Sequence, residues 1–155
     1  MNMSSTATDA LAALSRHVGL PLEFADESCD FLIGGQNFTI RSDGARERLV
    51  VSALVADDLP DNPSRALVAD LLGLGFGMME EGLPAVGRDP ETGFLAAFAF
   101  FPFAKLDAAG FPDAFEKFAA FATALADRLD RERHAPPSPP EEESEALPPG
   151  KFLQV

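Results

Sequence analysis

The chain has 155 residues, a formal net charge of −13 and 46% hydrophobic residues, with fourteen Phe but no Trp or Tyr. This length suits a single domain, and the charge argues against nucleic acid or an anionic membrane as a partner. One cysteine, Cys29, cannot form an intramolecular disulfide or a multi-cysteine metal site, which favours a reducing compartment. Without a signal-peptide core or a membrane-spanning apolar run, we expect a cytoplasmic protein.

The first half of the chain predicts one helix followed by three strands. Apolar residues recur at helical spacing over residues 5–17, and Gly19 suits the left-handed cap that ends a helix. The pair Gly34–Gly35 separates two apolar runs at 31–33 and 36–41, which is typical of a tight hairpin. A third strand follows at 47–56, with apolar residues on both of its faces.

The second half predicts a helix, two strands and a long helix. The helix at 63–72 is expected to end at the glycines of residues 73–77, and strands follow at 83–88 and from 94 onwards. The last helix, at 112–133, has a continuous apolar stripe. This order, α-β-β-β-α-β-β-α, predicts an α+β fold in which the first and last helices cover one face of a five-stranded antiparallel sheet.

Composition divides the chain into two parts. Residues 1–135 carry the predicted elements and form the domain. Residues 136–155 are rich in Pro and Glu, which predicts a disordered acidic tail.

The run from Phe94 to Phe103 is apolar on both sides of the predicted strand. Phe98 and Phe100 share one face, because successive side chains of a strand point to opposite sides. A strand with one solvated face alternates apolar with polar residues. Burial of both faces within the monomer would need more chain than this, so we predict that another polypeptide covers the outer face, as in a binding protein.

No group of residues predicts catalysis, a metal site or a cofactor site. His17 and His134 lie at the end of a helix and at the start of the tail, whereas a catalytic triad needs three converging groups. The acidic turn at 57–61 lacks the spacing of a calcium loop. The glycines at 73–77 end a helix, whereas a phosphate-binding loop follows a strand and opens one. We therefore expect a protein that is not an enzyme.

The order of elements, the acidic charge and several short phrases resemble the class I type III secretion chaperones, the Tir-chaperone (CesT-like) family. Each phrase is a pattern of apolar residues and turns, and their joint order over residues 5–133 carries the resemblance. The phrases are Leu11–Leu20, Phe38–Ile40, Leu49–Pro60, Ala66–Leu74, Gly82–Gly93 and Phe101–Asp107.

The resemblance implies a homodimer that binds the non-globular N-terminal segment of a secreted effector, without ATP, metal or another cofactor. The dimer interface implied on the second helix and the strand after it consists of Leu67, Leu71, Leu72, Leu74, Met78, Met79 and Leu83. The client contacts implied on the first helix and the sheet are Leu14, Val18, Phe31, Ile33, Phe38, Phe98 and Phe100. The acidic tail departs from the family's pattern.

Two other functions stay open at this point. The first is a regulatory or stress-related binding domain of the same architecture that has no secretion client, which the neighbouring genes would distinguish. The second is a small ligand-binding domain that uses the Phe-lined surface as a pocket, which metabolites bound to the purified protein would reveal.

Overall fold

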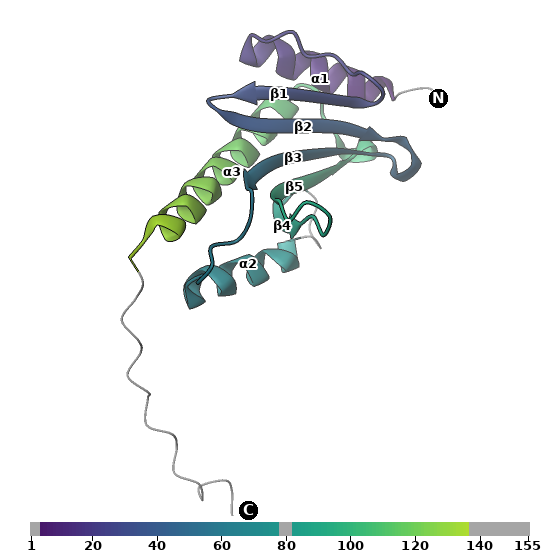
Figure 1. Cartoon of the computed structure of the whole chain (residues 1–155). Coiled ribbons are helices and arrows are strands. Elements are labelled where there is room, and N and C mark those ends of the chain that lie inside the picture. The colour runs from purple at the N-terminus through teal and green to yellow at the C-terminus, as the bar shows by residue number, and fades with distance from the viewer. Residues whose placement is uncertain (1–3, 78–81, 137–155) are drawn as a thin grey trace, which may run out of the picture.

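The computed structural model describes residues 4–77 and 82–136, which form three α-helices and one five-stranded antiparallel sheet (Figure 1). The strand order is β1-β2-β3-β5-β4, so β1 and β4 are the two edge strands. The predicted α+β fold and its element order are confirmed. The elements are α1 (Ser5–Val18), β1 (Ser28–Ile33), β2 (Gln36–Asp43), η1 (Gly44–Arg46), β3 (Arg48–Ala56), α2 (Arg65–Gly77), β4 (Ala85–Arg88), β5 (Leu95–Pro102), η2 (Phe103–Lys105) and α3 (Phe111–His134).

Local sequence explains where most elements begin and end. Gly19 caps α1 with φ 69°, and its N–H donates to the carbonyl of Ser15. Gly34 and Gly35 both have positive φ, as a two-residue hairpin link between twisted strands requires. The Ser64 hydroxyl accepts a hydrogen bond from the Leu67 N–H at 3.1 Å and caps the first turn of α2.

One predicted boundary is wrong. The helix at 63–72 does not end at Gly73 but continues as α2 to Gly77. A glycine inside a helix costs only about 1 kcal/mol relative to Ala. On either side of Gly73, Leu71 and Leu74 line the cleft between α2 and α3, and Leu71 also packs against the core.

The core lies between the sheet and the helices α1 and α3, which cover one face as predicted (Figure 1). The Phe38 ring of β2 lies between α3 residues, 5.1 Å from Phe115 and 6.5 Å from Phe118 between ring centroids. Leu49 and Val51 of β3 are completely buried on this inner face. The buried stripe of α3 consists of Phe111, Phe115, Phe118, Ala122, Leu125 and Leu129.

The register gives the sheet an inner and an outer face. Leu49 pairs with Phe101 and Val51 with Ala99 on the inner face, whereas Val50 pairs with Phe100 and Ser52 with Phe98 on the outer face. In the described ranges, α2 lies along β4, and no helix is drawn across the outer side of β1, β2 and β3 (Figure 1). Among the helices of this part of the chain, none combines the length and apolarity that crossing a membrane requires.

Candidate protein-binding surfaces

The seven client contacts implied by the resemblance do not lie on one surface. Phe31 and Phe38 are paired across β1 and β2 on the inner face, next to α1 and α3. Phe98 and Phe100 project from β5 on the outer face. The sheet itself separates the two groups, so they form two candidate surfaces.

Two of the seven residues belong to the core. Leu14 is 0% exposed and Phe38 is 2% exposed, and both are part of the buried cluster between the sheet and its helices. A bound segment cannot contact them while the domain stays folded. This corrects the prediction at these two positions, because helical or strand spacing alone does not tell a core residue from a surface one. We leave both out of the candidate surfaces.

Three other predicted residues, Val18, Phe31 and Ile33, lie at the end of α1 and along β1, at the β1 edge of the sheet. The end of α1 is fixed there, because His17 Nε2 lies 2.6 Å from Glu116 Oε1. The neighbouring Phe115 contacts the Phe31 ring of β1, with 5.7 Å between ring centroids. We call the half-buried apolar residues of this region the β1-edge patch, which consists of Val18, Leu20, Phe24, Phe31 and Ile33.

The edge of β1 that does not pair with β2 presents unpaired backbone groups beside this patch. The Ser42 N–H donates to the Glu27 carbonyl at 2.8 Å, and the register places these two residues opposite each other. In an antiparallel ladder, hydrogen-bonded pairs of residues alternate with pairs that are not hydrogen-bonded. Because Glu27 bonds to β2, the backbone groups of Cys29 and Phe31, two and four residues further on, also bond to β2. The backbone groups of Asp30 and Leu32 therefore point away from the sheet.

The segment before β1 does not cover this edge with a second strand. Ala25 and Ser28 exchange two hydrogen bonds across a turn in which Asp26 and Glu27 have positive φ. Before that turn, the Leu22 N–H and the Leu20 carbonyl bond to the Ser15 hydroxyl of α1. In the described residues, β1 has no ladder partner beyond Ser28 on its outer edge. An extended peptide can add there.

The outer face offers a second apolar surface with a cationic neighbour. The rings of Phe98 and Phe100 pack 5.4 Å apart, and the Arg48 guanidinium lies 4.0 Å above the Phe100 ring. Arg48 Nε also bonds to Asp43 at 3.2 Å. Burial tends to raise the pKa of Asp43, but hydrogen bonds from Arg48 and Arg46 outweigh it and hold that pKa below its ordinary value. Arg48 is thus kept over Phe100 by an ionised partner.

The second helix carries the implied dimer contacts in several environments. Leu67 is completely buried and belongs to the core, whereas Leu71 and Leu74 line a cleft of about 440 Å³ against Phe121 and Leu125 of α3. Leu72 is 72% exposed, and Leu83 before β4 is also exposed. Met78 and Met79 lie outside the described residues. Val68 is not among the predicted contacts, but its exposed side chain lies one helical turn from Leu72, and that spacing could have revealed it.

Polar contacts at the surface attach α2 to α3. Arg128 Nη1 bonds to Asp70 at 2.6 Å, and the Glu132 carboxylate accepts hydrogen bonds from the Ser64 N–H and hydroxyl, at 2.9 and 2.5 Å. The bond from the Ser64 hydroxyl, followed by that from its N–H, lowers the pKa of Glu132 below its ordinary value. The carboxylate therefore stays ionised at neutral pH and fastens the start of α2.

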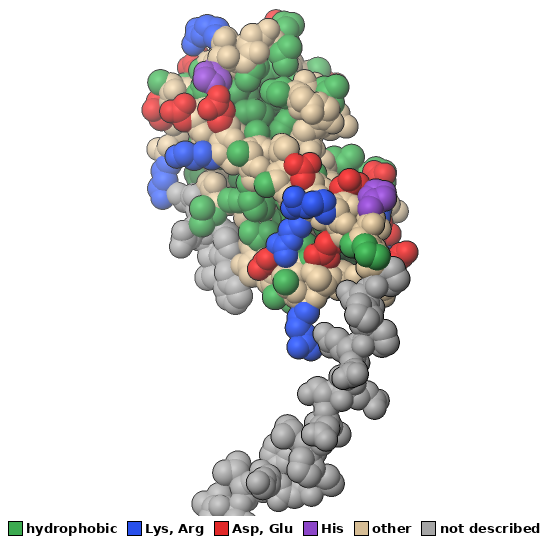
Figure 2. All heavy atoms as spheres, turned by 90° about the vertical axis from the view of Figure 1, so that its left-hand side faces the viewer, with side chains coloured by type: hydrophobic (Ala, Val, Ile, Leu, Met, Phe, Trp, Pro, Cys, Tyr) green, Lys and Arg blue, Asp and Glu red, His purple; other side chains and the backbone are tan. Residues whose placement is uncertain are grey.

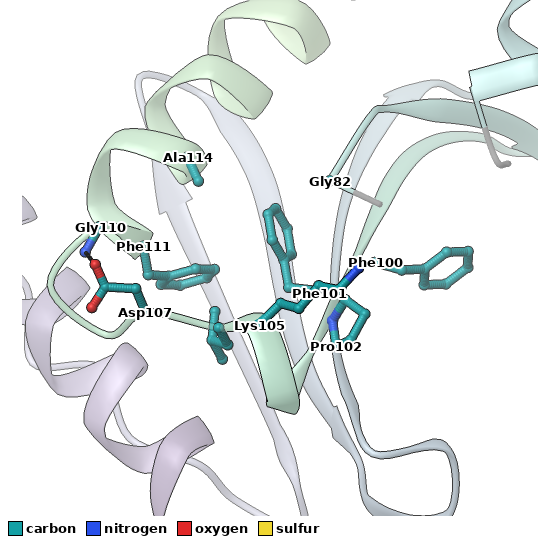
Figure 3. A pocket seen from close by; sticks show the side chains of 10 residues that line it. Gly82, Phe100, Phe101, Pro102, Lys105, Asp107, Gly110, Phe111 and Ala114 are labelled. Atoms are coloured by element: carbon teal, nitrogen blue, oxygen red, sulfur yellow. Dashed lines mark hydrogen bonds between the residues drawn. The ribbon is translucent and has the colours of Figure 1, made fainter. Parts of the chain in front are cut away.

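A third apolar feature lies where β5 ends and α3 begins. Figure 3 shows the Phe101 and Phe111 rings next to each other in the lining of this pocket, while the Phe100 ring points away on the other side of the strand. The two rings meet edge to face with 5.5 Å between centroids, and the pocket measures about 330 Å³. A hollow of this size, lined mainly by apolar groups, suits one or two apolar side chains.

Figure 2 shows the face that includes the ends of α1 and β1, where apolar side chains form a band flanked by charged groups. Within residues 4–77 and 82–136, no three His, Cys, Asp or Glu side chains are grouped to hold a metal ion. Cys29 is buried, and burial raises the pKa of its thiol. These surfaces have the chemistry of contacts with polypeptide.

Comparisons with known proteins agree with this geometry. The model of the Tir chaperone protein (CesT) family matches residues 9–126, which is more than half of the chain. No curated protein sequence matches. A chain of the HopA1–SchA chaperone–effector complex is 26% identical, with a TM-score of 0.60 over 87% of this chain and 99% of that one.

Two further solved structures share the fold at lower identity. A chain of the ExsC–ExsE complex is 22% identical, with a TM-score of 0.65 over 83% of this chain and 97% of that one. A chain of the ExoT–SpcS complex from Pseudomonas aeruginosa is 18% identical, with a TM-score of 0.56 over 82% and 99%.

Proposed function

Because the chain belongs to the Tir chaperone protein (CesT) family, we propose that it is a cytoplasmic type III secretion chaperone that binds the N-terminal segment of a secreted effector. It acts as a homodimer and keeps its client extended, without catalysis, ATP, metal or another cofactor. The observation that supports client binding most directly is the open edge of β1 beside the apolar β1-edge patch. The similarity to a chain of a chaperone–effector complex supports the same function.

The client adds to the sheet as an extended strand. Its main chain bonds to the outward N–H and C=O groups of Asp30 and Leu32, which gives affinity for any extended sequence. Its alternate side chains enter the β1-edge patch on one side and contact the exposed Leu32 on the other, which gives selectivity.

More surface than this edge is needed to hold a client. Ordering a disordered segment costs about 2–5 kcal/mol of the gross interaction energy. We infer that the client continues from β1 over further apolar areas: the pocket lined by Phe101 and Phe111, and the outer face at Phe98 and Phe100. The apolar area that the client buries by wrapping over separate patches offsets the free-energy cost of ordering it.

The substitution Asp30→Pro tests strand addition, because it removes one outward N–H and leaves the ladder to β2 intact. Asp30→Ala is the matched control, since both variants lose the carboxylate that accepts a bond from Thr39. The probe is the N-terminal segment of the protein encoded beside the chaperone gene, titrated by calorimetry. We expect Asp30→Pro to weaken binding about tenfold, which is ~1.4 kcal/mol, and Asp30→Ala to bind like the original chain.

Equal binding by the two variants would contradict strand addition at β1. Phe100→Ser, titrated in parallel, tests the outer face, and we expect it to weaken binding without changing the mass of the dimer in light scattering. A dissociated dimer would assign Phe100 to the contact between subunits instead. No binding by the original chain would contradict the proposed function for that effector.

A further inference from the structure

The sequence continues past α3 with a segment that the family match does not include. Residues 137–155 contain five prolines and an acidic run at 141–145, and they close with Lys151–Val155. Proline cannot donate to a strand ladder, and the acidic run is poor in strand-forming residues. Lys151–Val155 is free of proline and contains Phe152, Leu153 and Val155, so it is the part of the tail best suited to pair as a strand.

The tail leaves the domain at the end of the sheet where β1 ends. Asp130 and Arg133 of α3 line a hollow of about 270 Å³ together with Gly35 and Gln36, which follow β1 in the hairpin. Figure 1 shows α3 ending on the same side as the tip of the β1 arrow. A segment that runs from there along β1 passes from Ile33 towards Ser28, which is antiparallel to β1.

The tail is long enough to cover this distance. The residues between α3 and the closing segment, 135–150, span roughly 53 Å when extended, at about 3.3 Å a residue. The six residues of β1 span about 20 Å at the same rise. The connection can therefore place Lys151–Val155 anywhere along the open edge.

The charged residues around β1 favour Lys151–Val155 over the acidic run at 141–145 as the part of the tail that pairs with β1. The residues in and before β1 include Glu23, Asp26, Glu27 and Asp30, with Arg41 of β2 opposite Ser28. This excess of negative charge would repel the glutamates at 141–145. Lys151 is the one basic residue of the tail, and the residues after it match the β1-edge patch in apolar character. The acidic run is therefore suited to the linker.

We propose that Lys151–Val155 adds to β1 as an antiparallel edge strand in the client-free chaperone, and that the client displaces it. Only the displacement rests on the proposed function. The tail covers backbone groups and apolar side chains that would otherwise invite pairing with other chains. A client must compete with a segment tethered near the site at about millimolar effective concentration.

The first test needs no client. Hydrogen exchange is followed at the outward amides of Asp30 and Leu32 in the full chain and in the double variant Phe152→Asp/Leu153→Asp. The matched control is Ser144→Asp/Ala146→Asp, which adds the same charge in the linker. We expect both amides to exchange about tenfold faster in the first variant, if the tail occupies the edge nine-tenths of the time, and to keep their rate in the control.

The second test measures affinity for the effector segment described above. Because Asp30→Pro weakens the tail as well as the client, its tenfold effect on client affinity is expected in the Phe152→Asp/Leu153→Asp background. With the same occupancy, the first variant should bind about tenfold more tightly than the original chain, and the control should bind equally. Unchanged exchange in the first variant would overturn tail docking whatever the result with the client. If protection of the Asp30 and Leu32 amides grows with protein concentration, the added strand comes from a second copy of the chain. That result would also overturn docking of the chain's own tail. Faster exchange without any client binding would leave tail docking standing and contradict the proposed function.

Discussion

The two edges of the sheet differ in how they are held and in what they present. At the β1 edge, the adjoining helix α1 contributes completely buried residues such as Ala7 and Leu14 to the core. At the β4 edge, α2 contributes Leu67 to the core and keeps Leu72 exposed. Both β1 and β4 are edge strands, but α2 lies along β4 and presents apolar side chains, whereas the free edge of β1 lies beside the half-buried β1-edge patch.

This difference suits two kinds of partner. A backbone edge binds an extended segment, because strand pairing needs a fixed line of donors and acceptors. Apolar side chains on a helix suit a folded surface, and a second copy of the same helix is a common one. We therefore expect the client at β1 and the second subunit at α2, and the following experiments can contradict either expectation.

The largest effect is expected from Phe38→Ala, at the centre of the β1 side. This ring contacts Phe31, Phe115 and Phe118, and we expect its loss to lower the free energy of unfolding by about 3–5 kcal/mol. Urea unfolding measures the change, and Phe31→Ala, at a half-buried position, is the control with a smaller loss. An unchanged stability with lost client binding would return Phe38 to the client surface.

A smaller effect is expected from Leu72→Asp, on the α2 side. The side chain is 72% exposed, so the charge costs the monomer little, whereas an aspartate buried between two copies opposes association. We expect the dimer dissociation constant to rise at least thirtyfold, about 2 kcal/mol, as at a hot spot. Light scattering over a dilution series measures it. Ala66→Asp, on another side of α2, is the matched control, and equal effects would remove Leu72 from the interface.

Much of the fold could be predicted from local pattern. A single local conformation is predicted at Gly19, at the pair Gly34–Gly35 and along the apolar stripe of α3. The structure shows the predicted conformation at all three places. The doubly apolar character of β5 also predicted a sheet with apolar residues on both faces.

The candidate sites were harder to predict, because they depend on contacts between distant segments. Strand alternation places Phe31 and Phe98 on faces only once the register is known, and so the sequence alone could not separate the two surfaces. Leu14 and Leu72 are both leucines at helical spacing, and only packing makes one core and the other surface. The open edge of β1 has no side-chain signal at all, since it is made by the main chain.

The smallest effect is expected from the contact between Glu132 of α3 and Ser64 at the start of α2. The pKa of Glu132 is lowered in the folded chain by its bonds from Ser64, so its ionised form stabilises the fold above the ordinary carboxyl pKa. That stabilisation is lost as the pH falls through the lower pKa of the folded state. Glu132→Gln should therefore unfold at lower urea than the original chain at about pH 7, and the difference should shrink as the pH falls below the ordinary carboxyl pKa.

The comparison between the original chain and Glu132→Gln isolates this group, because Asp43 and Asp89, whose pKa values are also lowered, titrate alike in both. Hydrogen exchange should locate the loss at neutral pH in α2, while β1 keeps its protection. This pattern follows from the place of the group, since Glu132 contacts Ser64 at the start of α2, whereas α1 is held by buried apolar residues and by the contact of His17 with Glu116. A pH-independent difference, or a loss spread evenly over the sheet, would show that α2 is held mainly by Leu67 and its neighbours in the core.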